Sequence, residues 1–431
     1  MLFNSFKTLI FIGLLGFVSY SQELVPPIQN YLPAEYEAAS QNWDIALDKR
    51  GVVYIANNQG LLVYDGLSWE LFSLDSQSII RSVLPYDGRI YTGSYEEFGY
   101  WEVLKDGQMQ YISLKPLLKD YNLQSDEFWE ITAYNGAIYF RSFGGIFKYQ
   151  DNQIVKLKEV VSTALTVYKE NLIYSTKMNG LGYIKEIENL KIFGGDLTSL
   201  NGIDIVDLET RGDSLFIAGR KSLYLYYEGE LKQLGNARLK ELMERSELNH
   251  IKSISQNELI LGTIKNGIVH YDLLTDKFQV YNRKSGLQNN TILGMAYNNQ
   301  RMWLALDKGI DMIDLHAPIE FYTDNSGELG AVYDLCKSNG TYYLATNTGG
   351  YTFAGSSLRL LKNSGDHTWN LEEIGGVLYA NHNSGFYRID NQQFIPLDTR
   401  TGSFSVGTID NKIDSLILLH YTGVSLYDAR K

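Results

Sequence analysis

Aromatic residues with charged neighbours begin several short apolar stretches of the chain, where their side chains could recognise a sugar. A sugar ring presents an apolar face that stacks on an aromatic ring, and its hydroxyl groups bond to carboxylate, amide or guanidinium groups. A tryptophan begins three of these stretches, a carboxylate follows two of the tryptophans, and an arginine begins a fourth stretch. The alternative is that the rings only pack between neighbouring sheets. The candidate ligand-binding residues are Trp43, Asp44, Arg81, Trp129, Glu130 and Trp369.

The sequence contains none of the common motifs of catalysis and metal binding. It has no His-Glu-x-x-His, Gly-x-Ser-x-Gly, phosphate-binding loop or EF-hand loop. Its six histidines are scattered without metal-ligand spacing. Neighbouring carboxylates on a strand, such as Glu96 and Glu97, point to opposite faces and could not share one substrate. We therefore expect no catalytic residue, no metal and no cofactor, and a protein that is not an enzyme.

The elements that would position the candidates form a repeat of about 40 residues. A short motif recurs through most of the chain. It consists of a glycine, then apolar residues, and then an aromatic or apolar residue that in most copies precedes Asp. Periods of about 40–50 residues built from short strands are typical of propeller blades, each a four-stranded sheet. Copies begin at Gly60, Gly145, Gly267, Gly309, Gly385 and Gly423. We therefore predict an all-β fold of the β-propeller type.

The first repeat, between residues 43 and 72, shows four short apolar strands separated by turns rich in Gly, Asn and Asp. These turn residues tolerate the positive φ of hairpin loops. Ten repeats can be aligned, whereas one ring holds about four to eight blades. We predict a seven-bladed propeller over residues 42–330 and the first three blades of a second, incomplete propeller over 331–431. An incomplete second ring would mean a fragment of a longer protein or an unusual closure.

Two segments depart from the strand pattern. In the segment 236–247, Leu239, Leu242 and Met243 fall on one face of a helix, and Asn236 suits its N-cap. We therefore predict a helix there. The segment 104–127 is predicted to be a long insertion, which could serve binding or only pack on the rim.

The first residues have the pattern of a secretory signal. Lys7 precedes an apolar stretch, and small residues follow at Ser19 and Ser21. The stretch is shorter than the roughly 20 residues that a membrane helix needs. We predict a signal peptide over residues 1–21, an N-terminal leader over 22–41, export to the periplasm, and no membrane anchor in this chain.

The net charge and the cysteine content exclude two further features, a nucleic-acid partner and an internal disulfide. The formal net charge is −12, and no basic stripe that could bind phosphates is present, so we expect no nucleic-acid partner. Cys336 is the single cysteine, which rules out an internal disulfide. The fold must therefore be held by packing alone.

Several segments resemble the repeat of the two-component regulator propeller family. Residues 45–61 follow its pattern Ile-x-x-Asp-x-x-Gly-x-x-Tyr-x-Ala-Asn-x-x-Gly-Leu. Residues 284–292, Lys-Ser-Gly-Leu-Gln-Asn-Asn-Thr-Ile, resemble the segment that joins blades in that family. Residues 42–45, 80–83 and 97–101 are similar to the N-terminal blades of one branch, which is typical of Bacteroidetes.

In that branch, a periplasmic sensor with two seven-bladed rings continues into a triple-tyrosine domain, a membrane helix and a LuxR-type or histidine-kinase output domain. The resemblance implies a ligand-sensing module, for a carbohydrate, of a transmembrane signal-transduction regulator, here without its output domain. The implied partners are a small molecule or oligosaccharide and a second copy held through downstream regions. Two alternatives stay open: a propeller enzyme acting on glycans, such as a lyase or sialidase, and a protein-binding scaffold.

Overall fold

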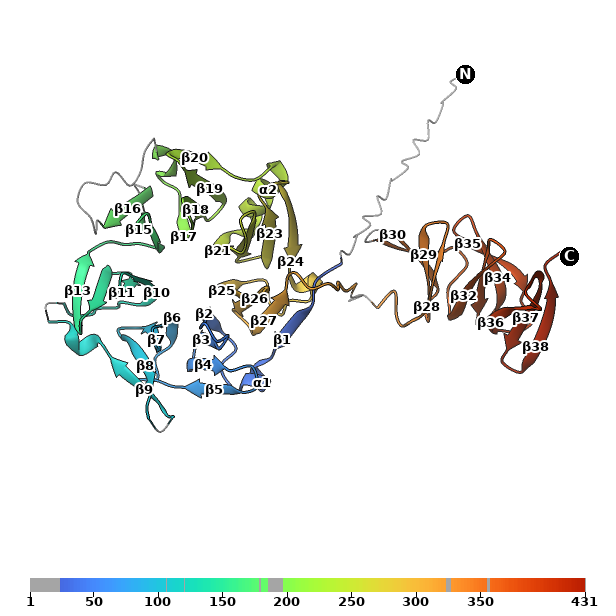
Figure 1. Cartoon of the computed structure of the whole chain (residues 1–431), viewed down its shortest axis with the longest axis horizontal. Helices are drawn as coiled ribbons and strands as arrows, with labels where there is room; N and C mark the ends of the chain where they lie inside the picture. Colours follow the sequence, from blue (N-terminus) through green and yellow to red (C-terminus); the bar gives the residue numbers. More distant parts are fainter. Residues whose placement is uncertain are drawn as a thin grey trace, which may run out of the picture. The chain divides into compact units, whose positions relative to one another are not determined.

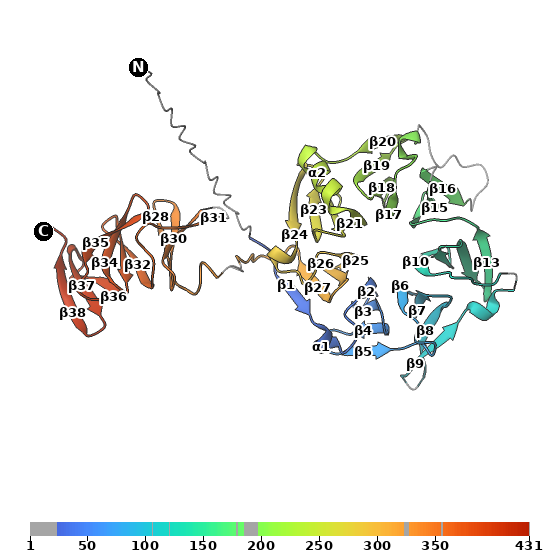
Figure 2. The same ribbon diagram turned by 180° about the vertical axis from the view of Figure 1, so that it is seen from behind.

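The computed structural model describes residues 24–105, 107–119, 121–177, 180–184, 197–322, 327–354 and 357–430. The chain divides into two compact units, Val25–Phe321 and Tyr322–Lys431, which Figures 1 and 2 show from opposite sides. Strands dominate both units, which confirms the predicted all-β class. The predicted signal peptide lies outside the described residues. Within the described ranges, no helix is long and apolar enough to cross a membrane.

Seven antiparallel sheets follow one another around a ring in the described part of the first unit, and this arrangement confirms the predicted propeller (Figure 1). Sheets one to three contain β2 (Asn42–Leu47), β3 (Val53–Asn57), β4 (Gly60–Tyr64) and β5 (Trp69–Phe72); β6 (Ile80–Tyr86), β7 (Arg89–Ser94), β8 (Phe98–Val103) and β9 (Met109–Ser113); and β10 (Phe128–Tyr134), β11 (Ala137–Ser142), β12 (Ile146–Gln150) and β13 (Gln153–Lys158). Sheets four and five contain β14 (Leu165–Tyr168), β15 (Asn171–Thr176) and β16 (Gly180–Ile184); and β17 (Ile205–Arg211), β18 (Ser214–Gly219), β19 (Ser222–Tyr227) and β20 (Glu230–Gln233). Sheets six and seven contain β21 (Leu248–Ser253), β22 (Glu258–Thr263), β23 (Ile268–Asp272) and β24 (Lys277–Tyr281); and β25 (Ile292–Asn298), β26 (Arg301–Leu306), β27 (Ile310–Asp314) and β1 (Ile28–Tyr31).

The ring closes through its N-terminal strand. β1 pairs antiparallel with β27, so the seventh sheet takes its outer strand from the opposite end of the unit. Tyr31 is buried there and stacks on Trp303 with ring centroids 5.5 Å apart. The prediction assigned residues 22–41 to a leader and 42–330 to the ring, whereas the compact unit spans Val25–Phe321 and includes β1.

The hydrophobic core lies between neighbouring sheets. Ile55 of the first sheet shares a cluster with Trp303 of the seventh, and Phe98 of the second sheet packs with Phe140 of the third. Burying each large apolar side chain contributes about 1.5–3 kcal/mol. Each sheet therefore covers an apolar face that its neighbour could not bury alone.

The recurring glycine has a steric cause at the start of the third strand of a sheet. Gly60 has φ +149°, and a Cβ there would lie 2.2 Å from the carbonyl oxygen of Phe72 on the outer strand. Gly267 has φ +72°, and a Cβ there would lie 2.0 Å from the carbonyl oxygen of Tyr281. A side chain would collide with the backbone of the fourth strand, so the sequence repeats glycine where this strand approaches.

Helices are few in the described part of the chain and lie in the connections between strands. The predicted helix at 236–247 is confirmed by α2 (Ala237–Ser246). The predicted N-cap is also confirmed, because the Asn236 side chain accepts a hydrogen bond from the N–H of Leu239 at 3.0 Å. The predicted insertion at 104–127 includes β9, the outer strand of the second sheet. The helical elements are α1 (Pro33–Tyr36), α2 (Ala237–Ser246), η1 (Lys115–Leu117), η2 (Thr198–Leu200) and η3 (Arg283–Ser285).

The second unit repeats the same sheet design. Leu371 and Phe394 share a cluster with residues of the preceding sheet, so these sheets also cover one another. Its described strands are β28 (Val332–Ser338), β29 (Thr341–Thr346), β30 (Gly350–Ala354) and β31 (Ser357–Leu360); β32 (Thr368–Ile374), β33 (Val377–His382), β34 (Gly385–Asp390) and β35 (Gln393–Asp398); and β36 (Ser403–Ile409), β37 (Lys412–His420) and β38 (Gly423–Asp428).

Candidate functional site

A β-bulge at the start of the first strand positions the candidate side chains of sheets one to three. The register of β2 against β3 shifts between Asn42 and Asp44, which makes Trp43 the extra residue. The same shift falls at Arg81 on β6 and at Trp129 on β10. A bulged residue leaves the ladder and is aimed away from the regular face of the sheet. Because the first strands surround the ring axis (Figure 1), three neighbouring sheets present these side chains at the same end of the ring.

Arg81 lies between the two tryptophans. Its guanidinium carbon is 4.0 Å from the centre of the Trp43 ring and 4.9 Å from that of Trp129. The two rings meet edge to face, with centroids 5.6 Å apart and planes at 76°. Each cation–π contact stabilises this arrangement by about 0.5–2 kcal/mol. The structure therefore brings three predicted residues into one group, which we call the Trp–Arg–Trp cluster.

The Trp–Arg–Trp cluster contains buried donors without acceptors. One terminal nitrogen of Arg81, Nη2, pairs with Oε1 of Glu127 at 3.1 Å. Its Nε and Nη1, and Nε1 of Trp129, are buried and have no hydrogen-bond partner among the described residues. An unsatisfied buried donor costs about 1–3 kcal/mol. Such donors are therefore suited to meet acceptor atoms that come from outside the chain.

Residues that the sequence analysis missed surround the same cluster. The Trp43 Nε1 donates to Oδ1 of Asn58 at 2.6 Å, and the ring of Phe143 lies 5.6 Å from that of Trp129. Both residues lie in the turn between the second and third strands of their sheets. In an antiparallel sheet, that turn is at the same end as the start of the first strand. This topological relation could have identified Phe143, which is 47% exposed.

Asp44 uses its carboxylate to connect neighbouring sheets. Its Oδ1 accepts a hydrogen bond from the N–H of Ile45 at 2.8 Å, and its Oδ2 accepts one from the N–H of Val83 at 3.0 Å. Val83 belongs to the next sheet. Asp207 makes the equivalent bond to Ile251 at 2.9 Å. Asp44 was predicted as a sugar partner, but in the structure each of its oxygens already accepts a backbone N–H.

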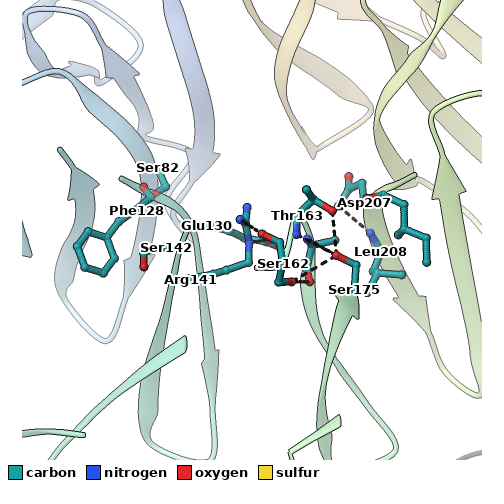
Figure 3. Close-up of polar contacts among 12 residues, drawn as sticks. Ser82, Phe128, Glu130, Arg141, Ser142, Ser162, Thr163, Ser175, Asp207 and Leu208 are labelled. Atoms are coloured by element: carbon teal, nitrogen blue, oxygen red, sulfur yellow. Dashed lines mark hydrogen bonds and ion pairs between the residues drawn. The ribbon is translucent and has the colours of Figure 1, made fainter. Parts of the chain in front are cut away.

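Glu130 forms an ion pair beside the ring axis. Its Oε2 accepts a hydrogen bond from Nε of Arg141 at 2.9 Å, and Arg141 also donates to the backbone carbonyl of Ser162 at 2.8 Å (Figure 3). Burial raises the pKa of Glu130 to about 7, although the charge of Arg141 opposes this rise. Near neutral pH, the Glu130 side chain can therefore exist in both the protonated and the charged form.

Three further titratable groups interact around the axis. Burial raises the pKa of Asp44 to about 6. Burial alone would lower the pKa of His250, but its hydrogen bond to Asp207 and the charges of Asp207 and Asp44 raise it overall. The His250 Nδ1 lies 3.4 Å from Oδ2 of Asp207. The described residues contain no group of three His, Cys, Asp or Glu side chains that could hold a metal ion.

Trp369 belongs to the second unit and has neighbours of its own. It occupies the bulge of β32, the position that Trp43 has on β2. Its ring stacks on Tyr333 with centroids 5.2 Å apart, and its Nε1 donates to the Tyr421 hydroxyl at 2.9 Å. The six candidates therefore separate into the Trp–Arg–Trp cluster, the sheet-linking Asp44, the ion-paired Glu130, and Trp369.

Comparison with known proteins identifies the fold. No family model and no curated protein matches the chain. Among solved structures, the extracellular domain of a hybrid two-component system of B. thetaiotaomicron is 16% identical with a TM-score of 0.71, and the match covers 94% of this chain and 59% of that domain. The extracellular domain of a one-component system of the same organism is 17% identical with a TM-score of 0.53, covering 95% and 59%. This chain thus spans about 59% of the length of either domain.

A propeller of different function also matches. Virginiamycin B lyase from Staphylococcus aureus is 14% identical with a TM-score of 0.52, and the match covers 67% of this chain and 99% of the lyase. At these identities, the likeness shows the propeller fold. The two Bacteroides domains are consistent with the resemblance to two-component regulator propellers that residues 45–61 indicate.

Proposed function

We propose that the chain is the periplasmic ligand-sensing part of a signal-transduction regulator, without enzymatic activity, and that it binds an oligosaccharide at the Trp–Arg–Trp cluster. The observation that carries this proposal is the set of buried donors on Arg81 and Trp129 that have no acceptor among the described residues. The two aromatic rings of the cluster come from the first and third sheets, and Arg81 comes from the second sheet between them.

The chemistry of the cluster suits a sugar. Ring and hydroxyl oxygens of a sugar accept hydrogen bonds, so they can satisfy Nε and Nη1 of Arg81. The apolar face of the sugar can stack on an exposed aromatic ring such as Phe143. The carboxylate of Glu127, which pairs with Arg81, can accept hydrogen bonds from sugar hydroxyls. One face of the ring thus offers donors, an acceptor and stacking surfaces together.

Calorimetric titration of the mature protein with a panel of plant and microbial oligosaccharides tests the proposal. We expect saturable binding of at least one oligosaccharide, with no product formed from it. Arg81→Ala should weaken that binding about tenfold or more, because it removes the unsatisfied donors.

Arg89→Ala is the matched control. Arg89 also lies over an aromatic ring, with its guanidinium carbon 4.2 Å from the centre of Tyr100, but it is at the turn between β6 and β7. This end of the sheet is opposite to the bulge. Equal affinities of the two variants, or no binding by the unaltered protein, would refute the proposed site.

An enzyme acting on glycans is the second candidate function, favoured by one observation. Glu130, with its pKa raised to about 7, and the pair of His250 and Asp207 belong to the first strands of their sheets, β10, β21 and β17, and these strands surround the ring axis (Figure 1). A carboxyl group that titrates near neutral pH can transfer protons. Release of unsaturated or hydrolysed products from the same panel, abolished by Glu130→Gln, would support the enzyme and contradict the sensor.

A further inference from the structure

The second unit repeats the bulge of the first strand in three consecutive sheets, and each bulge carries an aromatic residue. The register shifts place Tyr333 in β28, Trp369 in β32 and Phe404 in β36. These are the positions that Trp43, Arg81 and Trp129 hold in the ring. The second unit therefore has three aromatic side chains where the first combines aromatic and charged ones.

Two further rings join these three into one surface. His367 stacks on Trp369 with centroids 5.0 Å apart, and Tyr333 stacks on Trp369 at 5.2 Å. Phe404 contacts Tyr421 with centroids 5.5 Å apart. The hydrogen bond from Trp369 Nε1 to the Tyr421 hydroxyl connects the two groups. We call Tyr333, His367, Trp369, Phe404 and Tyr421 the aromatic platform.

The aromatic platform is open to solvent. Tyr333 is 45% exposed, Phe404 38% and Tyr421 49%, and Trp369 is half-buried. Single exposed aromatic residues are ordinary on protein surfaces, whereas a continuous exposed apolar patch is a mark of recognition. Stacked rings on rigid strands also lose little conformational entropy when they bind a ligand.

Polar groups border the platform and are themselves held in place. Asp366 has φ +97°, a conformation that residues other than glycine rarely adopt. Its carboxylate accepts hydrogen bonds from Nδ2 of Asn383 and from the backbone N–H of His367, both at 2.8 Å. These bonds hold the pKa of Asp366 well below its usual range, so the group is charged. Asn383 in turn accepts a hydrogen bond from the Tyr421 hydroxyl at 2.5 Å.

The charge at this border selects among saccharides. Among the described residues, no Arg or Lys side chain lies within ion-pair distance of Asp366, and its neighbour at that distance is the imidazole of His367. A carboxylate without an Arg or Lys partner repels uronate and sulfate groups but accepts hydrogen bonds from sugar hydroxyls. Apolar sugar faces can stack on the exposed rings of Tyr333 and Tyr421.

We propose that the aromatic platform of the second unit is a binding site for a neutral oligosaccharide, separate from the Trp–Arg–Trp cluster. It spans three consecutive sheets, so it accommodates several sugar residues of one chain. The site stands on the contacts of the second unit alone and does not depend on the function proposed for the ring.

Titration of the mature full chain with cellohexaose, xylohexaose, mannohexaose and laminarihexaose tests this site, with oligogalacturonate as the acidic comparison. We expect saturable binding of at least one neutral hexasaccharide. Trp369→Ala should weaken that binding about tenfold or more, and Tyr421→Ala should weaken it similarly. Tyr421→Phe retains the ring and should preserve most of the affinity. Arg89→Ala, which lies outside both proposed sites, should leave it unchanged.

The outcomes separate the two sites. Tyr421 is an exposed turn residue, so its alanine variant remains informative even where Trp369→Ala fails to fold. Absence of binding by all four neutral hexasaccharides, or unchanged affinity in Tyr421→Ala, overturns the platform site. Loss of that binding in Arg81→Ala also overturns it, because the ligand would then belong to the ring. Binding of oligogalacturonate in preference to every neutral chain contradicts the selectivity.

Discussion

Oδ2 of Asp44 accepts a hydrogen bond at 3.0 Å from the backbone N–H of Val83, the residue that corresponds to Ile45 in the next sheet. One side chain thus ties the inner strands of two consecutive sheets together. Ser82 does the same by another route, because its hydroxyl donates to the backbone carbonyl of Phe128 in the third sheet at 2.8 Å. Side-chain bonds to backbone therefore connect the first strands of neighbouring sheets, and Figure 3 shows Ser82 beside Phe128.

Replacement of Asp44 should destabilise the ring. Asp44→Ala leaves the N–H groups of Val83 and Ile45 without their acceptor, so we expect a loss of about 1–3 kcal/mol in the free energy of unfolding. Chemical denaturation followed by tryptophan fluorescence measures it. Asp75→Ala, at an exposed position, is the control and should stay within about 0.5 kcal/mol of the unaltered protein. Equal losses in both variants would contradict a linking role for Asp44.

The ring should be more stable at pH 5 than at pH 8. Burial raises the pKa of Glu130 from its ordinary 4.5 to about 7, so the folded state holds a proton that the unfolded chain releases between these values. This stabilisation is present near pH 5 and is lost as the pH rises through about 7. The raised pKa of Asp44 acts in the same direction. Calorimetric melting from pH 5 to 8 should show the decline.

Glu130→Gln isolates this contribution. The variant cannot titrate at this position, so the fall in stability between pH 5 and 8 should be smaller by roughly 1–3 kcal/mol. The two proteins should be closest in stability near pH 5, where Glu130 in the folded protein is protonated and, like Gln, uncharged. A pH profile that the substitution leaves unaltered would mean that Glu130 has no raised pKa.

Glycine at the start of a third strand should be irreplaceable where the fourth strand approaches it. Gly267→Ala places a Cβ about 2.0 Å from the Tyr281 carbonyl oxygen, so we expect a loss of about 2 kcal/mol or more. Gly423→Ala is the matched control at the same position of the repeat, because no atom of the described residues lies within 4 Å of its Cβ. Thermal unfolding measures both. A Gly423 variant as unstable as the Gly267 variant would disprove the steric explanation.

Closure of the ring should depend on one tyrosine of β1. Tyr31→Ala removes a buried ring that stacks on Trp303 and meets Trp69 at 5.3 Å, and the cost should be about 3 kcal/mol. Gln29→Ala, exposed on the same strand, should be nearly neutral. Limited proteolysis at the N-terminal side of β2 measures opening of the closure. Equal protection of the two variants would show that β1 does not hold the seventh sheet.

The sequence was sufficient to predict the propeller because the repeat has a backbone cause. Gly60 and Gly267 occur where the fourth strand leaves no room for a Cβ, so the glycine recurs even where surrounding residues differ. The short strand β1 carries no such glycine and stands outside the repeat. Its pairing with β27 joins residues distant in sequence, and the segment was therefore predicted to be a leader.

The candidate site was only partly predictable for a similar reason. Trp43, Arg81 and Trp129 could be found because they begin inner strands, and the structure places them together. Their outward aim depends on the bulge, a shift in pairing that residue types do not reveal. Phe143 comes from a turn, where aromatic residues have no periodic signal. Asp44 follows a tryptophan in the sequence, but its carboxylate is directed to the backbone of the next sheet.

The pairing of β1 with β27 also governs how the ring assembles. β1 is synthesised before every other strand of the ring, yet its partner is the last ring strand to emerge. Until then, the incomplete ring exposes an apolar sheet face at each end, and β1 has an unpaired edge to which strands of other chains could add. Contacts between such distant residues form slowly. A chaperone that covers these exposed surfaces would therefore act in the interval before β1 pairs with β27.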